Sequence, residues 1–182
     1  MTDVSKTIAI VLAAGRGTRA GGTHPKQWRM LLGKSLTAWS VEAFMSHAEI
    51  DAVVVVHHPE DQEMIAQLPA AVRFLYGGAN RDDSVRCALK ALKDQAPEYV
   101  LIHDAARPCL TQSLISRCMD AMRACGAAAP AVALQDTLWR GGDTVEATVD
   151  RSDLWPAQPP QCFFTTGICP AHAAATRPAP DV

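Results

Sequence analysis

The sequence predicts an α/β fold with a mostly parallel sheet, and three observations support this. Short runs of apolar and β-branched residues alternate with segments of helical periodicity, which is the pattern of βαβ units. The most apolar runs, 8–14 and 52–56, show no polar alternation, as expected for strands buried on both faces of a parallel sheet. The chain has 182 residues and is 48% hydrophobic, which is enough for the core of one domain.

The expected strands and helices follow one another along the chain. Strands are expected where apolar or β-branched residues run together, at 8–14, 52–56, 72–76, 99–103 and 127–134. Helices are expected where apolar residues recur at helical spacing, at 36–47, 60–68, 114–125 and through Val85, Leu89 and Leu92. Asp82 or Asp83 can cap the helix through Val85, and Pro97 ends it. Pro130 should lie at an edge or bulge of the last strand. Because ligands bind beyond the carboxyl ends of parallel strands, the segments after these strands are candidate sites.

Residues 137–153 are expected to form a protruding β-hairpin arm. Gly141, Gly142 and Asp143 can turn the chain, and residues 145–149 alternate apolar with other residues. A hairpin of this size is hardly stable alone in water, so it should pack on another subunit. A surface hairpin with solvated charges is the alternative. Residues 164–182 are rich in Pro and Ala and are expected to be a disordered tail, which leaves one domain over residues 1–163.

Charge and composition argue against several classes of protein. A formal net charge of −2 and a pI near 6.3 argue against general affinity for nucleic acids or membranes. No apolar run approaches the roughly 20 residues of a membrane span. The six cysteines form no C-x-x-C pair, so free and mostly buried thiols in a reducing cytoplasm are expected. The apolar run after Lys6 is short for a signal peptide and ends in arginines, so export is not expected.

A glycine-rich, cationic loop follows the first strand. Residues 5–40 contain six Lys and Arg and no Asp or Glu, which suits a phosphate-rich ligand. Residues 15–20 formally satisfy the dinucleotide fingerprint G-x-G-x-x-G/A, but Gly21, Gly22 and Pro25 break the helix that it requires. A P-loop fails because Trp28 occupies the place of its first glycine. What remains is a loop that wraps a nucleoside triphosphate, or an ordinary strand-to-helix loop with solvated cations.

Two further strand ends carry candidate residues. After the third strand, Gly78 allows close backbone approach, and Arg81 and Ser84 lie at the start of the next helix, where a nucleotide can bind. A glycine turn before a capped helix is the alternative there. After the fourth strand, Asp104 projects from the end of a buried strand, where Mg²⁺ beside phosphates would satisfy the carboxylate. An ion pair between Asp104 and Arg107 is the alternative.

Four motifs carry a family resemblance. In chain order they are A-A-G-R-G-T-R with P-K-Q at 13–19 and 25–27, H-D-A-A-R-P at 103–108, D-T at 136–137 and T-V-D-R at 148–151. Together they closely resemble the 2-C-methyl-D-erythritol 4-phosphate cytidylyltransferases of non-mevalonate isoprenoid biosynthesis, over residues 8 to 163. The resemblance implies a Rossmann-like, three-layer αβα nucleotidyltransferase fold and a homodimer joined through the arms. It also implies transfer of CMP from CTP to 2-C-methyl-D-erythritol 4-phosphate with Mg²⁺ as the cofactor.

The resemblance further implies roles for individual residues. Those expected to be catalytic are Arg19, Lys26 and Arg151, the last acting in the partner's site. Those expected to bind the nucleotide are Ala13, Ala14, Gly15, Arg16, Gly17, Gly78, Arg81, Ser84 and Ala105. Those expected to bind the acceptor are Arg107, Thr137 and Arg151. The expected Mg²⁺ ligand is Asp104.

The chain departs from the family pattern at three places. Ala79 stands where the family often has an acidic residue, and Pro159 stands where it has Thr. The family's later segment, which bears a second lysine, has no counterpart here. Two alternatives to an active cytidylyltransferase therefore remain: a catalytically deficient homologue that binds CTP, and a related sugar-phosphate nucleotidyltransferase.

Overall fold

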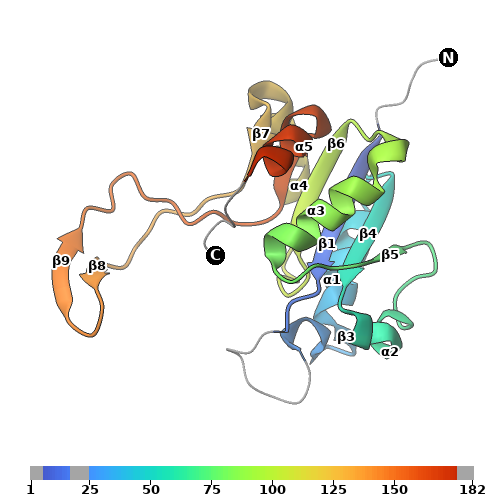
Figure 1. The fold of residues 1–182 in the computed structure, drawn as a ribbon, viewed down its shortest axis with the longest axis horizontal. Coiled ribbons are helices and arrows are strands. Elements are labelled where there is room, and N and C mark those ends of the chain that lie inside the picture. The colour runs from blue at the N-terminus through green and yellow to red at the C-terminus, as the bar shows by residue number, and fades with distance from the viewer. Residues whose placement is uncertain (1–5, 17–24, 176–182) are drawn as a thin grey trace.

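The protein folds around one six-stranded, mostly parallel sheet (Figure 1). The structure, a computed structural model, describes residues 6–16 and 25–175. The sheet has the strand order β5-β4-β1-β6-β10-β7. Its strands are β1 (Thr7–Ala13), β4 (Ala52–His57), β5 (Arg73–Tyr76), β6 (Tyr99–Asp104), β7 (Ala127–Ala128) and β10 (Gln161–Phe164). The first four in chain order, β1, β4, β5 and β6, run parallel, whereas β10 runs antiparallel to both β6 and β7. The predicted α/β class is confirmed.

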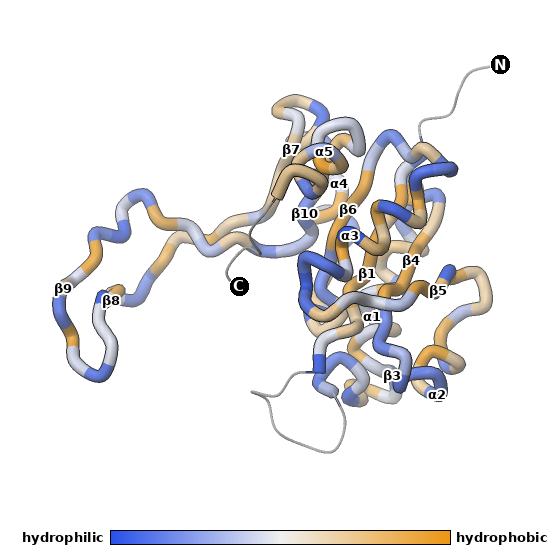
Figure 2. The backbone as a smooth tube through the Cα atoms, viewed as in Figure 1, coloured by the Kyte–Doolittle hydropathy of each residue, from blue (hydrophilic) through white to orange (hydrophobic). Residues whose placement is uncertain are grey.

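Helices cover both faces of the sheet, which gives the expected three layers. On one face α1 (Leu36–Met45) and α4 (Gln112–Cys125) pack against Ala9 and Val11 of β1. On the other face α3 (Arg81–Ala91) and α5 (Thr165–Ala174) pack against Ile8 and Ile10. Successive side chains of β1 thus enter opposite cores, which explains its unbroken apolar run. Figure 2 shows the same concentration of hydrophobic residues in the central strands.

Short elements connect these layers. They are η2 (Lys26–Trp28), β2 (Met30–Leu31), β3 (Lys34–Ser35), η3 (Pro59–Asp61), α2 (Gln62–Ile65) and η4 (Lys93–Gln95). Within the described residues, no helix is long and apolar enough to cross a membrane.

The arm is a two-stranded hairpin made of β8 (Leu138–Gly141) and β9 (Val145–Val149), as the sequence predicts. It projects far from the sheet (Figure 1). Trp139 on β8 is 67% exposed and Trp155 just beyond the hairpin is 59% exposed, although both are large and apolar. Such side chains are typical of a surface that packs against another chain.

The structure corrects the expectation of a disordered tail from residue 164. The domain continues through β10, which ends at Phe164, and Thr165–Ala174 form α5. Ile168 on this helix is buried against the α3 face of the sheet. The apolar contact of Ile168 orders a segment whose composition alone suggested disorder, despite Pro170 inside the helix. Residues 176–182 lie outside the described part of the chain.

Three smaller expectations are also wrong. The strand predicted at 127–134 is only Ala127–Ala128 long, because Pro130 has no N–H to continue the ladder, and only Ala131 makes a further isolated bridge. Asn80 caps α3 through its side-chain oxygen, in place of Asp82 or Asp83. The six cysteines are free, as expected, but only Cys118 and Cys162 are buried.

Gly126 ends α4 with a left-handed backbone, at φ +87°. We expect Gly126→Ala to lower the free energy of unfolding by about 1 kcal/mol, because a Cβ strains this conformation. No atom lies within 4 Å of the added Cβ, so the substitution tests backbone strain without a steric clash. The matched control is Gly167→Ala inside α5, which also meets no neighbour and should leave stability unchanged or raise it. Urea unfolding at equal protein concentration measures both, and equal effects would contradict the prediction.

Candidate active site

The carboxyl ends of the parallel strands bring three predicted segments together. A Cβ on Gly77, just after β5, would lie 2.4 Å from Cβ of Ala14 and 2.9 Å from Oγ of Ser84. The backbone N–H of Gly78 donates to Oγ of Ser84 at 3.1 Å, and the N–H of Ala105 donates to the carbonyl of Leu12 at 3.0 Å. The structure therefore places the residues after β1, β5 and β6 at one edge of the sheet, where α/β folds bind their ligands.

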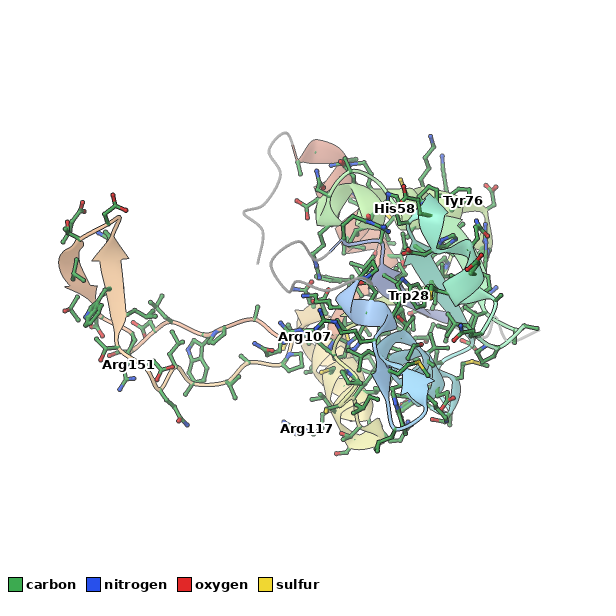
Figure 3. The ribbon with its side chains drawn as sticks, turned by 90° about the horizontal axis from the view of Figure 1, so that it is seen from below. Trp28, His58, Tyr76, Arg107, Arg117 and Arg151 are labelled. Carbon is green, nitrogen blue, oxygen red and sulfur yellow. The ribbon has the colours of Figure 1, made fainter. Side chains whose placement is uncertain are left out.

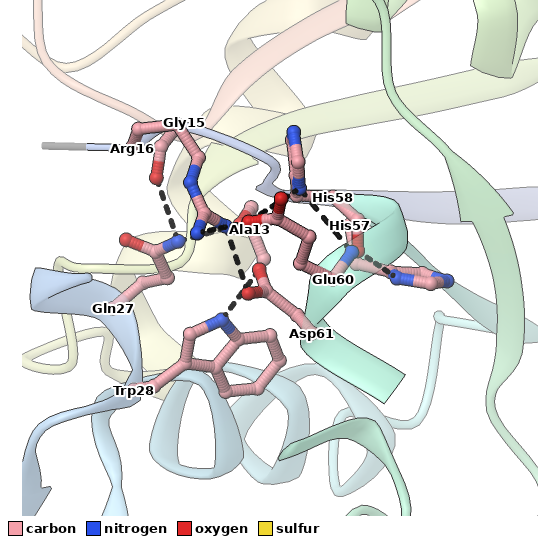
Figure 4. A network of polar contacts seen from close by, with 9 residues as sticks. All are labelled: Ala13, Gly15, Arg16, Gln27, Trp28, His57, His58, Glu60 and Asp61. Atoms are coloured by element: carbon pink, nitrogen blue, oxygen red, sulfur yellow. Dashed lines mark hydrogen bonds and ion pairs between the residues drawn. The ribbon is translucent and has the colours of Figure 1, made fainter. Parts of the chain in front are cut away.

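Lys26 is held beside the end of β1 by its neighbour Gln27. The buried side-chain amide of Gln27 donates to the carbonyls of Ala13 at 2.7 Å and of Gly15 at 2.8 Å (Figure 4). The hydroxyl of Thr37 in α1 donates to the backbone carbonyl of Gln27 at 2.9 Å. These bonds fix η2 at the site while the side chain of Lys26 stays exposed, available to a phosphate.

A second group of contacts was not foreseen from the sequence. The guanidinium of Arg16 donates to Asp61 at 2.9 Å and to Glu60 at 2.8 Å, and the indole N–H of Trp28 donates to Asp61 at 2.8 Å. Figure 4 shows Asp61 between Arg16 and Trp28. None of the sequence motifs contains Asp61, and the P-K-Q motif contains Gln27 without indicating its partners. These contacts join residues that are far apart in the sequence, and no periodicity links them.

Asp104 lies between two arginines at the end of β6. Nε of Arg81 is 3.3 Å from one carboxylate oxygen, and Nε of Arg107 is 3.6 Å from the other. Arg81 also donates to Gln161 of β10 at 3.2 Å, and Arg107 donates to Gln158. Asp104 thus forms the ion pair with Arg107 that the sequence offered as an alternative, and a second ion pair with Arg81. Its side chain remains 34% exposed.

His103 precedes Asp104 and is a packed residue at the end of β6. Its ring meets Phe44 edge-on at 5.4 Å, and its Nε2 lies 3.0 Å from the carbonyl of Arg107. Burial lowers the pKa of His103 below its ordinary value, so the ring is neutral near pH 7 and Nε2 is the donor in this bond. An imidazole buried in this way is a poor acceptor for a substrate proton.

The expected acceptor residues on the arm are not at this edge of the sheet. Arg151 lies on the arm, well separated from Arg107 at the arm's base (Figure 3), and both Thr137 and Arg151 are exposed. One chain therefore does not bring them together with Lys26 and Asp104. Gly17 and Arg19 lie outside the described residues.

The donor set for a metal ion is small. Within the ranges that the structure describes, no group of three or more His, Cys, Asp or Glu side chains could hold a metal by itself. Any ion at this edge would depend on a single carboxylate and on oxygen atoms supplied by substrate and water. This is the manner in which Mg²⁺ binds beside phosphates.

Comparisons with known proteins agree with the motifs. A sequence profile of the 2-C-methyl-D-erythritol 4-phosphate cytidylyltransferase family matches residues 7–182, so the similarity extends beyond the expected limit at residue 163. The enzyme of that name from Cereibacter sphaeroides strain KD131 is 46% identical over 173 residues, which cover 92% of this chain and 77% of that protein. The bifunctional enzyme IspD/IspF of Dinoroseobacter shibae is 48% identical over 177 residues, 95% of this chain and 44% of that protein.

Solved structures agree as well. The crystal structure of 2-C-methyl-D-erythritol 4-phosphate cytidylyltransferase from Thermus thermophilus matches with a TM-score of 0.75 at 31% identity, covering 94% of this chain and 79% of that one. The fold, the site and these relatives lead to one conclusion. The chain belongs to the 2-C-methyl-D-erythritol 4-phosphate cytidylyltransferase family.

Proposed function

We propose that this protein transfers CMP from CTP to 2-C-methyl-D-erythritol 4-phosphate and releases pyrophosphate. The observation that carries the proposal is the convergence of Ala14, Gly78 and Ser84 beside an exposed Lys26 whose backbone is fixed. The phosphate of the acceptor attacks the α-phosphorus of CTP in line with the leaving pyrophosphate. The attacking oxygen is already ionised, so no protein nucleophile or base is required, in keeping with a neutral and buried His103.

The protein's contribution is to position the substrates and stabilise charge. Backbone amides after β1, from Ala14 to Gly17, hold the triphosphate, and Lys26 with Arg19 stabilises the charge that develops on the α-phosphate. Gly78, Arg81, Ser84 and Ala105 bind the base and ribose. These assignments follow the family resemblance, and the described residues among them gather at the same edge of the sheet.

Mg²⁺ is the proposed cofactor, and Asp104 is its proposed ligand. The ion, when bound, would neutralise charge on the triphosphate. The site fits such an ion because Asp104 offers a partly exposed carboxylate, and its contacts of 3.3 and 3.6 Å to the two arginines are longer than the about 2.7–2.9 Å of a tight charge-assisted bond. The carboxylate therefore keeps free capacity for a cation.

A homodimer joined through the arms is the proposed assembly. It would let Thr137 and Arg151 of one chain reach the acceptor in the site of the other. We expect Trp139→Ser to weaken the dimer at least about tenfold. Trp139 is 67% exposed in the single chain and would be buried in the dimer interface, where truncating an aromatic anchor typically costs more than about 1 kcal/mol. Leu32→Asn is the control, since Leu32 is 85% exposed and lies off the arm. Sedimentation velocity over a range of concentrations measures both, and equal dimer affinities would contradict the role of the arm.

Turnover tests the proposed reaction. Pyrophosphate release is measured with CTP, Mg²⁺ and 2-C-methyl-D-erythritol 4-phosphate, with ATP, GTP and UTP in parallel. Selective turnover of CTP supports the proposal. A folded protein that binds CTP without turnover contradicts it and favours the catalytically deficient alternative.

We place the reaction in the cytoplasm, and the six free cysteines support a reducing compartment.

A further inference from the structure

Asp61 is a buried carboxylate that none of the motifs contains. It lies at the end of η3, and only 5% of its side chain is exposed. One oxygen accepts from the guanidinium of Arg16 at 2.9 Å, and the other accepts from the indole N–H of Trp28 at 2.8 Å (Figure 4). Arg16 follows β1 and Trp28 ends η2, so one side chain ties together two segments that are separate in the sequence.

The neighbouring Glu60 makes a different kind of contact. It also binds Arg16, at 2.8 Å, but 71% of its side chain is exposed. Exposed ion pairs add little because water screens both charges, whereas a buried carboxylate must keep its partners. Asp61 is therefore the member of this pair that restrains the structure, and Glu60 is a natural control.

The restraint bears directly on Lys26. Lys26 is the first residue of η2. Gln27, the next residue, is hydrogen-bonded to β1, and Trp28, the one after it, is hydrogen-bonded to Asp61. Within η2, Trp28 donates its backbone N–H to the carbonyl of Pro25, and Arg29 donates to that of Lys26. The Trp28 ring is also buried in the core, so loss of Asp61 would leave its indole N–H without this acceptor and loosen the Trp28 side of this short turn.

The same contacts decide what the Arg16 side chain does. Its single positive charge faces two carboxylates, so it is already neutralised at this site. A guanidinium bound in this way is not free to hold a triphosphate. We therefore expect the backbone of Arg16, and not its side chain, to contact the nucleotide.

We infer that Asp61 is a positioning residue for Lys26 in the transfer reaction, and that the guanidinium of Arg16 acts through Asp61 and not on the triphosphate. The inference rests on the proposed function. Its test compares Asp61→Asn, Arg16→Gln and the double variant with Glu60→Gln as the control. Asp61→Asn should lower kcat by about 10- to 100-fold, as a misplaced catalytic group does, while KM for the acceptor changes less than about twofold. Glu60→Gln should stay within about twofold of the wild type.

The double variant distinguishes action of Arg16 through Asp61 from direct contact of Arg16 with the triphosphate. If Arg16 acts through Asp61, the variant with both changes should have a kcat within about twofold of Asp61→Asn alone. Likewise, Arg16→Gln should leave the Kd for CTP, measured by calorimetry, within about twofold. A Kd raised about tenfold by Arg16→Gln in both backgrounds would overturn the inference, because it would show direct contact with the triphosphate.

A readout without substrate separates this inference from the proposed function. Hydrogen exchange of a peptide covering residues 25–31 should become faster in Asp61→Asn and stay unchanged in Glu60→Gln. Unchanged exchange in Asp61→Asn would overturn the inference whatever the activity, whereas absence of turnover in the wild type would overturn the proposed function. If Asp61→Asn does not fold, Trp28→Phe keeps an aromatic ring and removes the indole N–H together with the five-membered ring that carries it. It should speed the same exchange, and unchanged exchange in that variant would also overturn the inference.

Discussion

Lys26→Ala is expected to lower kcat for cytidylyl transfer by more than about tenfold, because it removes a charge-assisted contact to the reacting phosphate. The structure makes this variant informative. The side chain of Lys26 is exposed, whereas Gln27 and Trp28 hold the backbone of η2 in place. The substitution therefore removes a positive charge without releasing the turn, and the thermal midpoint of unfolding should change little. Steady-state kinetics with saturating CTP, Mg²⁺ and acceptor measures the loss.

Lys34→Ala is the matched control for this prediction. Lys34 belongs to the same acid-free stretch of the sequence, but its ammonium pairs with Glu42 at 2.6 Å and lies 4.9 Å from the Trp39 ring centre. Removing it takes a similar charge from a position engaged elsewhere, so kcat should stay within about twofold. If Lys26→Ala kept full kcat, or if both variants lost the same activity, Lys26 would not act on the reacting phosphate.

The sheet was predictable because its signal is local. The runs at 8–14, 52–56 and 99–103 are apolar without alternation, and the structure buries each of them as a central strand with helices on both faces. The hairpin of the arm was also predictable, since its glycines and alternating residues are adjacent. α5 was missed because its composition is rich in Ala and includes Pro170, and the contact that orders it, Ile168 on the α3 face, is long-range.

The site was predictable only in part, for a similar reason. Gly78, Ser84 and Ala105 follow parallel strands, and a parallel sheet necessarily brings such positions to one edge. The contacts of the nearby arginines depend on side-chain geometry, which the spacing of residues in the sequence does not reveal. Arg16 reaches Asp61, and Arg81 reaches Asp104 and Gln161, across separate elements of the fold. The sequence therefore identified the cations of the site and Asp104, but neither Asp61 nor the contact between Arg81 and Asp104.

Asp104→Asn is expected to lower kcat by about 10- to 100-fold and to raise the Mg²⁺ concentration needed for half-maximal activity, since contacts to charged groups are worth about 1.5–3 kcal/mol. The substitution keeps the size of the side chain at the end of β6 and removes its charge. Two effects follow from the geometry. The cation loses its proposed carboxylate ligand, and Arg81 and Arg107 lose their shared partner. Rates measured across a Mg²⁺ titration separate these effects.

A loss of metal binding shifts the titration midpoint, so part of the rate should return at high Mg²⁺. A loss of arginine positioning lowers the rate at every Mg²⁺ concentration and leaves the midpoint unchanged. Asp120→Asn on α4 is the control, because Asp120 is an exposed carboxylate that pairs with Arg123 at 3.4 Å, away from the site. It should change neither rate nor midpoint. An unshifted midpoint in Asp104→Asn would assign Asp104 to the arginines alone, and the metal would then be held by the triphosphate without a carboxylate from the protein.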